Sequence, residues 1–514
     1  MTQKIKEQEQ NGLLCGIRSL FPAASFCLLT AVMMTGCEGW FTTNIPASGH
    51  AYFRNTPNAS LIASRDPAAA KNLNNLRQLA VKNGSVRLIV GVRVAVAPKG
   101  MMSANDIELQ RARIAAAQTA VLNKIVSLKQ KLQTLKLFAN IPFMAVEANL
   151  PELEALASLP EITSIEEDRI ATPLDAQSDS LIGGTTAWGS GYSGAGQTIA
   201  ILDSGVDKTH PFLAGKVVSE ACYSSNNAAD GATSVCPGGV AQSTAAGSAM
   251  PYSGTCPAGG CEHGTVVAGI AAGNNGTFYG VAKDASLIAI QVFSRFDSVA
   301  NCGSATPCTL TYTSDQIMGL QQVYALRNTY HIAAVNMSLG AGQYSSQSTC
   351  DSANPSIKAA IDILRSVNIP TIVASGNNGY LNSMSAPGCI SSAISVGATF
   401  DVVGYSNNCA GNNLGISSLD AILCESNSAS FLNLLAPGAE INSSIPGGGY
   451  AAWYGTSMAA PQVAGAWAIM KQKNAGLTVT AGLNALSSTG ISITDPRNSI
   501  AKPRIQINAA LSSI

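Results

Sequence analysis

Apolar runs of strand length alternate with helical patterns over most of the chain after residue 175. Five of these runs carry polar residues or glycine at or near their ends: TIAILDSG (198–205), SLIAIQVF (286–293), AAVNMSLG (333–340), PTIVASGNNG (370–379) and AISVGA (393–398). Helical patterns such as SDQIMGLQQVYALRN and SIKAAIDILRSV lie between several of them. Apolar strands that alternate with helices predict an α/β fold, a doubly wound parallel sheet with helices on both faces. Ligands bind such sheets at the carboxyl ends of the strands, where this chain places its polar residues.

A smaller unit with a different pattern comes before this region. SVRLIVGVRVAV (85–96) predicts a strand, and Ser103 is placed to cap a helix whose apolar positions recur every three or four residues. The run IPFMAVEANL, the short helical segment PELEALASLP and the closing strand EITSIEED follow. This β-α-β-α-β order predicts a small α+β domain over residues 85–170, and we place the α/β domain at 175–514.

The N-terminus has the pattern of a leader. Basic residues precede the apolar stretch from Leu20 to Cys37, which is short for a membrane-spanning helix and suits a signal peptide over residues 1–37. Its last four residues, MTGC, resemble a bacterial lipoprotein cleavage box, which would leave Cys37 as the lipidated first residue. The alternative is an ordinary secretory signal in which Cys37 has no role. Residues 38–84 are polar and small, and they predict a spacer.

The charge balance narrows the possible partners. Lys plus Arg and Asp plus Glu both number 30, and only 12% of residues are charged. A neutral chain gives no electrostatic reason to expect nucleic acid or an anionic membrane surface as a partner. We therefore expect one of two localisations. The protein is either held in the cell envelope by a lipid anchor or secreted.

The cysteines agree with export. Of 13 cysteines, three lie in the leader and the others begin at Cys222. An even number confined to one region of an exported chain predicts disulfides. Sequence alone does not select among the pairings, and proximity favours five local bridges: Cys222–Cys236, Cys256–Cys261, Cys302–Cys308, Cys350–Cys389 and Cys409–Cys424. The alternative to disulfides is a zinc site held by cysteines. The chain contains no CxxC pair that would support it, so we expect no metal site.

A serine, a histidine and an aspartate stand at positions that suit nucleophilic catalysis. Ser457, in YGTSMAAPQVAG, begins a helix of small residues, and a serine hydroxyl needs a neighbouring base to become a nucleophile. His263, in CEHGTVVAG, heads a second helix of small residues that is able to approach the first closely. Asp203 ends a buried strand, where a carboxylate needs a partner, and a bond to the imidazole would satisfy it. Asn377 ends another strand and is a candidate donor to an oxyanion.

Five segments resemble, in the same order, the motif blocks of the subtilisin-like serine proteases (subtilases): AILDSGVD, EHGTVVAG, VNMSLGAG, ASGNNG and YGTSMAAPQVAG. The resemblance implies a triad of Asp203, His263 and Ser457, with Asn377 as the oxyanion donor. It also implies that two segments line the substrate pocket, Ser338-Leu339-Gly340 and Ala374-Ser375-Gly376. The unit at 85–170 resembles the family's inhibitory propeptide, which we expect the enzyme to cut off itself between about 168 and 180.

These residues predict a serine endopeptidase that acts on proteins or peptides and needs no cofactor. No group of carboxylates indicates the calcium loop that many subtilases use, so calcium is possible without support from the sequence. The alternative is a non-catalytic binding or adhesion module with the same fold. An α/β-hydrolase esterase would need Gly-x-Ser-x-Gly, and Ala459 stands where the second glycine would be.

Overall fold

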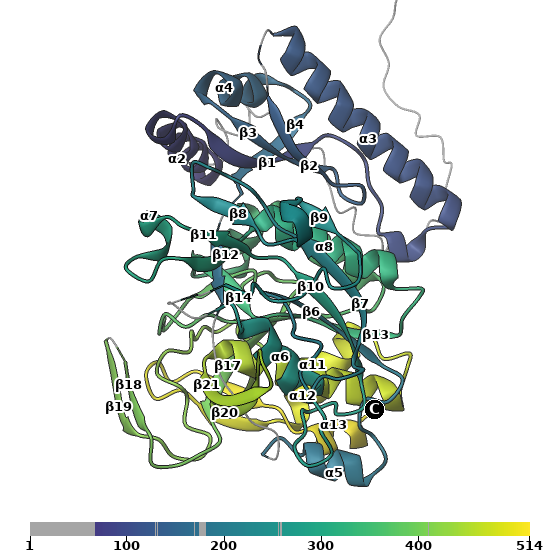
Figure 1. Ribbon diagram of the computed structural model, residues 1–514, viewed down its shortest axis with the longest axis vertical. Coiled ribbons are helices and arrows are strands. Elements are labelled where there is room, and N and C mark those ends of the chain that lie inside the picture. The colour runs from purple at the N-terminus through teal and green to yellow at the C-terminus, as the bar shows by residue number, and fades with distance from the viewer. Residues whose placement is uncertain are drawn as a thin grey trace, which may run out of the picture. The chain divides into compact units, whose positions relative to one another are not determined.

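The computed structural model describes residues 67–128, 130, 132–168, 170–173, 181–254, 256, 260–409 and 411–514 (Figure 1). The predicted leader, with Cys37, and residues 38–66 of the predicted spacer lie outside the described residues. None of the helices in the described part of the chain is both long and apolar enough to cross a membrane.

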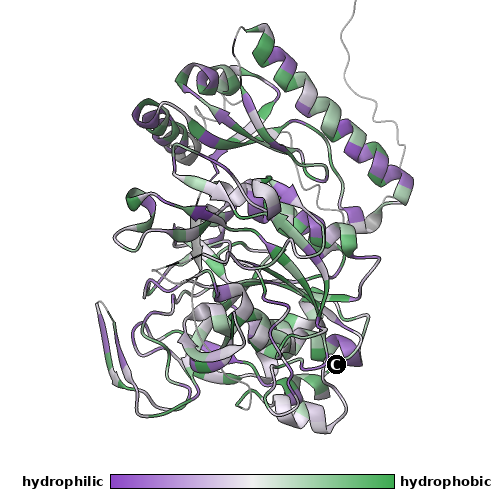
Figure 2. Ribbon diagram, viewed as in Figure 1, coloured by the Kyte–Doolittle hydropathy of each residue, from purple (hydrophilic) through white to green (hydrophobic). Residues whose placement is uncertain are grey.

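The N-terminal unit is an antiparallel sheet covered by helices, which is an α+β arrangement. Its strands lie in the order β2-β3-β1-β4, and its helices include a 24-residue α3 whose N-terminus Ser103 caps by accepting from Asp106 N–H. Polar and apolar residues alternate along α3 (Figure 2), and its apolar positions face the sheet. The elements are β1 (Val86–Val92), β2 (Gln133–Leu137), β3 (Phe143–Ala148), β4 (Ile162–Glu167), α2 (Pro67–Asn83), η1 (Lys99–Met101), α3 (Ala104–Ser127) and α4 (Leu150–Ser158).

The predicted spacer is wrong over its last part. Residues 67–83 form helix α2, and Leu76 and Ala80 are buried in the same core as strand β1. The sequence did not predict this helix because its many Asn, Lys, Arg and Gln residues interrupt the apolar periodicity. The unit therefore begins at or before residue 67 rather than at 85.

The second unit is built on a mainly parallel sheet of 11 strands, which confirms the predicted fold class. The five predicted strands all lie in it, next to two further long strands that the sequence pattern missed. The main strands are β6 (Thr198–Asp203), β7 (Val217–Tyr223), β10 (Ser286–Gln291), β13 (Ile332–Met337), β15 (Thr371–Ala374), β17 (Ile394–Phe400) and β20 (Leu434–Ile445). The sequence pattern missed β7 and β20 because their apolar runs contain polar or turn-forming residues. These are Ser219-Glu220 in β7 and Pro437-Gly438 in β20.

Each face of this sheet has its own hydrophobic core. Along β6, Ile199 and Ile201 belong to one core, and Ala200 and Leu202 belong to the other, because side chains alternate across a strand. Helices α6 (His263–Ala272) and α11 (Thr456–Lys473) cover the first face, and α8 (Thr313–Leu326) and α10 (Pro355–Ser366) cover the second. The sheet is therefore doubly wound.

A second, six-stranded sheet joins the two units. It contains β8 (Ala232–Ser234), β11 (Ser294–Phe296), β12 (Cys308–Tyr312), β14 (Leu339–Tyr344) and β16 (Met384–Ala386). Strand β5 (Ile170–Pro173), which follows the N-terminal unit, lies between β14 and β12 and is antiparallel to both.

The shorter elements complete the second unit. They are α5 (Gly184–Gly189), η2 (Pro237–Gly239), β9 (Gln242–Ser243), α7 (Val299–Cys302), α9 (Gln347–Ala353), β18 (Ser406–Cys409), β19 (Asn412–Ile416), β21 (Gly449–Tyr454), α12 (Val479–Thr489), β22 (Ile491–Thr494), β23 (Ala501–Arg504) and α13 (Ile507–Ser512).

Four of the five predicted disulfides are present: Cys222–Cys236, Cys256–Cys261, Cys302–Cys308 and Cys350–Cys389. The fifth prediction is wrong, because Cys409 and Cys424 are free thiols. The two thiols are nevertheless neighbours, because Cys409 contributes to the pKa of Cys424. Burial raises the pKa of the Cys424 thiol to about 12, and the hydrogen bond with Cys409 adds to the rise.

Candidate active site

Asp203 and His263 meet where a strand ends and a helix begins. Asp203 is the last residue of β6 and His263 is the first of α6, and Asp203 Oδ1 lies 2.7 Å from His263 Nδ1. Both side chains are fully buried. A carboxylate on Nδ1 holds the ring proton there, so Nε2 presents the lone pair that a general base needs.

The close approach of α6 to the loop after β6 depends on Gly264. A Cβ at this position would lie 2.3 Å from Gly205 O, which no side chain tolerates. Gly264 N–H also donates to Ser204 Oγ at 3.0 Å. This hydrogen bond joins the residue after His263 to the residue after Asp203. The small residues that marked this helix in the sequence therefore position the Asp203–His263 pair.

Ser457 lies in the first turn of α11, the central helix of the first core. Gly455 precedes this helix with a φ of 126°, a conformation that favours glycine. The Ser457 hydroxyl lies 3.2 Å from Ser338 O, and Ser338 Oγ donates to Ser457 O at 2.5 Å. Helices α6 and α11 pack against each other (Figure 1), so the two predicted helix heads belong to one packed layer.

The side-chain amide of Asn377 has a fixed orientation. Its Oδ1 accepts from Thr456 N–H at 2.9 Å and from Thr456 Oγ at 2.8 Å. The backbone N–H is able only to donate, so the oxygen must face Thr456, and Nδ2 with its two N–H groups points the other way. The residue before the serine thus positions the donor that the sequence predicted.

The two predicted pocket segments lie next to these residues. Ser338 is the single residue between β13 and β14, Leu339 and Gly340 begin β14, and Ala374 ends β15 ahead of Ser375 and Gly376. Sequence reasoning missed Asn427, which holds the second segment. Its Oδ1 accepts from Asn378 N–H and Tyr380 N–H, and its Nδ2 donates to Ser375 O, each at 3.0 Å. Asn427 stands in a serine-rich loop without a periodic pattern, so the sequence carried no signal for it.

Strand β5 lies beside the first pocket segment. Pro173 is paired with Leu339, and Thr172 is paired with Gly340. On its other side, Ala171 is paired with Thr311, and Ile170 is paired with Tyr312. An extended stretch of the chain itself therefore runs between β12 and β14, in a register that leads toward Ser338 and the Ser457 hydroxyl.

Two carboxylates of the N-terminal unit hold it against helix ends of the second unit. Asp168 accepts from Ser314 N–H and Ser314 Oγ, both at 2.7 Å, in the first turn of α8. Glu166 accepts from Ser356 N–H at 3.1 Å and from its hydroxyl, in the first turn of α10. Both acceptors satisfy free N–H groups at the positive end of a helix.

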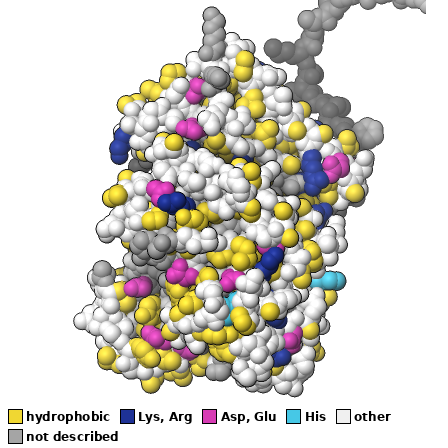
Figure 3. Space-filling model, viewed as in Figure 1, with side chains coloured by type: hydrophobic (Ala, Val, Ile, Leu, Met, Phe, Trp, Pro, Cys, Tyr) yellow, Lys and Arg dark blue, Asp and Glu magenta, His cyan; other side chains and the backbone are white. Residues whose placement is uncertain are grey.

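Charged groups elsewhere on the visible face are scattered in small groups (Figure 3). Within the described residues, no three His, Cys, Asp or Glu side chains are arranged to hold a metal ion.

The chain resembles known proteases over most of its length. The family model described as the subtilase family matches residues 194–491. An alkaline protease of Alkalihalobacillus alcalophilus is 32% identical over 369 residues, 71% of this chain and 78% of that protein. Subtilisin E of Bacillus subtilis is 32% identical over 63% of this chain and 69% of its own, and alkaline serine exoprotease A of Vibrio alginolyticus is 29% identical over 60% and 45%. The chain therefore belongs to the subtilase family, and it is a serine endopeptidase that acts on proteins or peptides.

Proposed function

We propose that Asp203, His263 and Ser457 are the catalytic triad of this endopeptidase. Ser457 Oγ attacks the peptide carbonyl carbon, and His263 Nε2 takes the hydroxyl proton. His263 then gives that proton to the leaving amine, and water hydrolyses the acyl-enzyme by the same route in reverse. The observation that carries the proposal is the buried hydrogen bond between Asp203 and His263, because it orients the imidazole and stabilises its cation.

The oxyanion of the tetrahedral intermediate needs donors on the other side of the carbonyl. Asn377 Nδ2 and the backbone N–H of Ser457 supply them in this proposal. The hydrogen bonds from Thr456 support the role of Asn377, because they fix its amide before substrate arrives.

A fluorophosphonate probe tests the triad directly. The purified protein should react at Ser457, and Ser457→Ala and His263→Ala should abolish labelling, whereas Ser488→Ala on α12 should not. A folded protein that remains unlabelled and inactive would instead be a non-catalytic binding module with a subtilase fold.

We further propose that residues up to about 173 form a propeptide that the enzyme removes from itself. The antiparallel pairing of Pro173 with Leu339 supports this. If the register continues, the residue after Pro173 comes opposite Ser338, whose carbonyl oxygen accepts from the Ser457 hydroxyl. The bond under attack would then lie shortly after Pro173, inside the interval from 168 to 180.

Self-processing has a clear test. Ser457→Ala should accumulate as the uncut precursor in a host that lacks other proteases, whereas the wild-type chain should yield a mature N-terminus between residues 174 and 180. Normal maturation of Ser457→Ala in that host would show that another protease makes the cut.

Export through the leader and lipidation at Cys37 complete the proposal. The support is the apolar stretch ending in MTGC and the four disulfides, which form in oxidising compartments. The exported protein should partition into detergent, and Cys37→Ser should not. Detergent partitioning that survives Cys37→Ser would indicate an uncleaved apolar leader instead.

A further inference from the structure

We propose that Tyr312 and Asp315 form a subsite for a basic side chain of the substrate, several residues upstream of the cleaved bond. In the precursor, Arg87 and Lys136 of the N-terminal unit occupy this subsite. The inference rests on the proposed removal of that unit, and it adds a specificity determinant that the triad and the pocket segments do not supply.

The first cation, Arg87, is paired with Asp168 of its own unit at 2.9 Å and also lies over the ring of Tyr312. The central carbon of the Arg87 guanidinium lies 3.7 Å from the ring centroid, the geometry of a cation–π contact. Arg87 Nη2 also donates to Ser225 Oγ at 3.2 Å and to Ser314 Oγ at 3.4 Å. Both hydroxyls belong to the second unit, so they remain when the N-terminal unit leaves.

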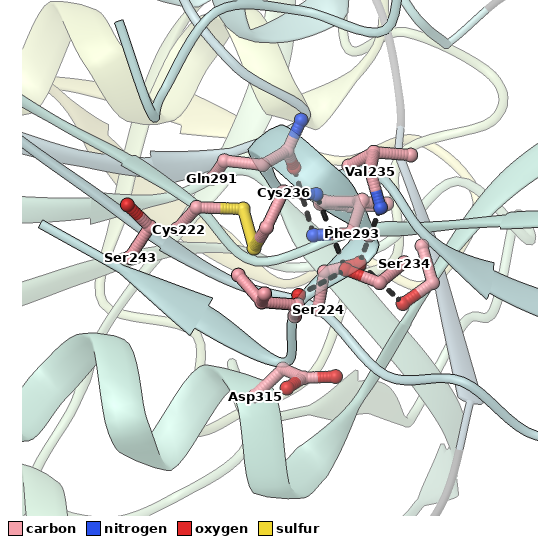
Figure 4. The surroundings of a disulfide bond; sticks show 12 residues. Cys222, Ser224, Ser234, Val235, Cys236, Ser243, Gln291, Phe293 and Asp315 are labelled. Carbon is pink, nitrogen blue, oxygen red and sulfur yellow. Dashed lines mark hydrogen bonds between the residues drawn. A yellow bond between two sulfur atoms is a disulfide. The ribbon is translucent and has the colours of Figure 1, made fainter. Parts of the chain in front are cut away.

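Asp315 holds the second cation. Its carboxylate is fully buried and accepts from Lys136 Nζ and, at 2.8 Å, from Ser225 Oγ. Burial raises the pKa of Asp315, and the ammonium of Lys136 opposes this rise. Figure 4 shows Asp315 projecting from α8 below the segment that carries Cys222 and Ser224. Removal of Lys136 leaves this carboxylate without its counter-ion, which favours binding of another cation.

Strand β5 indicates which substrate residues reach the subsite. Ile170 is paired with Tyr312, and Asp168, two residues earlier, contacts Ser314 beside Asp315. A substrate on the same path would therefore place the residue equivalent to Ile170, and the one or two residues before it, next to Tyr312 and Asp315. A basic residue at or just before that position has both the aromatic ring and the carboxylate within its surroundings.

Peptides that differ in a single group test the subsite on enzyme matured from the full chain. All would contain Ile-Ala-Thr-Pro-Leu followed by a chromogenic amide, with arginine, citrulline or glutamate placed before the isoleucine. Citrulline keeps the size and shape of arginine without its charge. We expect kcat/KM for the arginine peptide to exceed that for the citrulline peptide about tenfold, roughly 1.4 kcal/mol. The advantage should shrink as salt is raised, because counter-ions screen a partly exposed pair.

Variants of the enzyme test whether Asp315 and Tyr312 cause the preference for arginine. Asp315→Asn and Tyr312→Leu should each bring the ratio of arginine to citrulline rates toward one, whereas Asp284→Asn, which removes a surface carboxylate paired with Lys283, should leave it unchanged. If Asp315→Asn fails to mature, the peptide comparison on the wild-type enzyme still decides the proposal. Equal rates for the two peptides would overturn it. No cleavage of the unextended core peptide would instead count against the proposed function.

Discussion

Asn377 offers a sharp test at the scale of one residue. Asn377→Ala removes the side-chain donor and leaves Thr456 and the backbone in place. We expect kcat to fall about 10²- to 10³-fold, the loss known for the corresponding oxyanion donor of subtilisin, about 3 to 4 kcal/mol. KM should change little, because the hydrogen bond strengthens mainly in the transition state. Steady-state kinetics on a peptide amide measure both constants, and an unchanged kcat would mean that another group stabilises the oxyanion.

The sequence predicted Asp203, His263, Ser457 and Asn377 because each lies at or just after the end of a strand or in the first turn of a helix, where backbone constraints make the residue type informative. Asn427 has no such position. It acts through three hydrogen bonds to a loop about fifty residues earlier in the chain, and only the folded structure brings the two together.

At the scale of elements, the cap on α8 predicts how firmly the N-terminal unit is held. Asp168→Ala would remove two hydrogen bonds to Ser314 and leave Arg87 buried without its carboxylate. Loss of a helix cap costs about 1 kcal/mol, and a buried charge without its partner costs about 3 to 5 kcal/mol. Urea unfolding of the precursor, blocked from processing by Ser457→Ala, should show a loss of at least 2 kcal/mol. Glu154→Ala, at an exposed ion pair with Arg77, is the control and should stay within about 1 kcal/mol.

The cysteines give a second prediction at this scale. Alkylation in denaturant without reductant should label Cys409 and Cys424 and none of the eight cysteines in the four bridges. Reduction before alkylation should label those eight as well, and it should lower the melting temperature. Peptide mapping by mass spectrometry distinguishes the outcomes. If neither Cys409 nor Cys424 were alkylated without reductant, the two would be joined by the fifth disulfide that the sequence predicted.

The elements that the sequence missed share a physical cause. Strand β2, which was not predicted, carries Gln133 and Lys136 in a short run without a fully buried residue, and α2 has many long polar residues on its outer surface. Strong apolar periodicity belongs to elements that are buried on a whole face. Elements at the edge of a core bury too few side chains to produce it.

For the molecule as a whole, Lys99 couples the stability of the precursor to pH. Lys99 is 2% exposed, and its ammonium donates to Asn140 Oδ1. The pKa of Lys99 is lowered to about 7, chiefly by burial. The charges of Arg111 and Arg327 contribute to this lowering, and Glu108 opposes it. Arg327 belongs to the second unit and η1 packs on α10, so part of this environment exists only while the two units are joined.

The direction of the pH effect follows from proton counting. Between about pH 7 and 10.5 the unfolded chain keeps a proton on Lys99 that the folded precursor has released, so the free energy of unfolding should rise with pH across that window. Below about pH 7 both states are protonated, and Lys99 contributes no slope. Urea unfolding of the Ser457→Ala precursor at several pH values should show this rise. Lys99→Met should flatten it, and the exposed Lys82→Met should not. An equal slope in Lys99→Met would assign the effect to other groups.

The position of β5 in the middle of its sheet has a consequence for what the mature enzyme digests. If the proposed cut releases β5, β12 and β14 would face each other across a gap one strand wide, and each would present unpaired backbone N–H and C=O groups. Any polypeptide that fills the gap must offer an extended segment whose own backbone groups are free. Strands and helices of a native protein have those groups already paired. On this proposal we expect the mature enzyme to discriminate by the folded state of its target before it discriminates by side chain, and to cleave unfolded or locally frayed proteins faster than native ones.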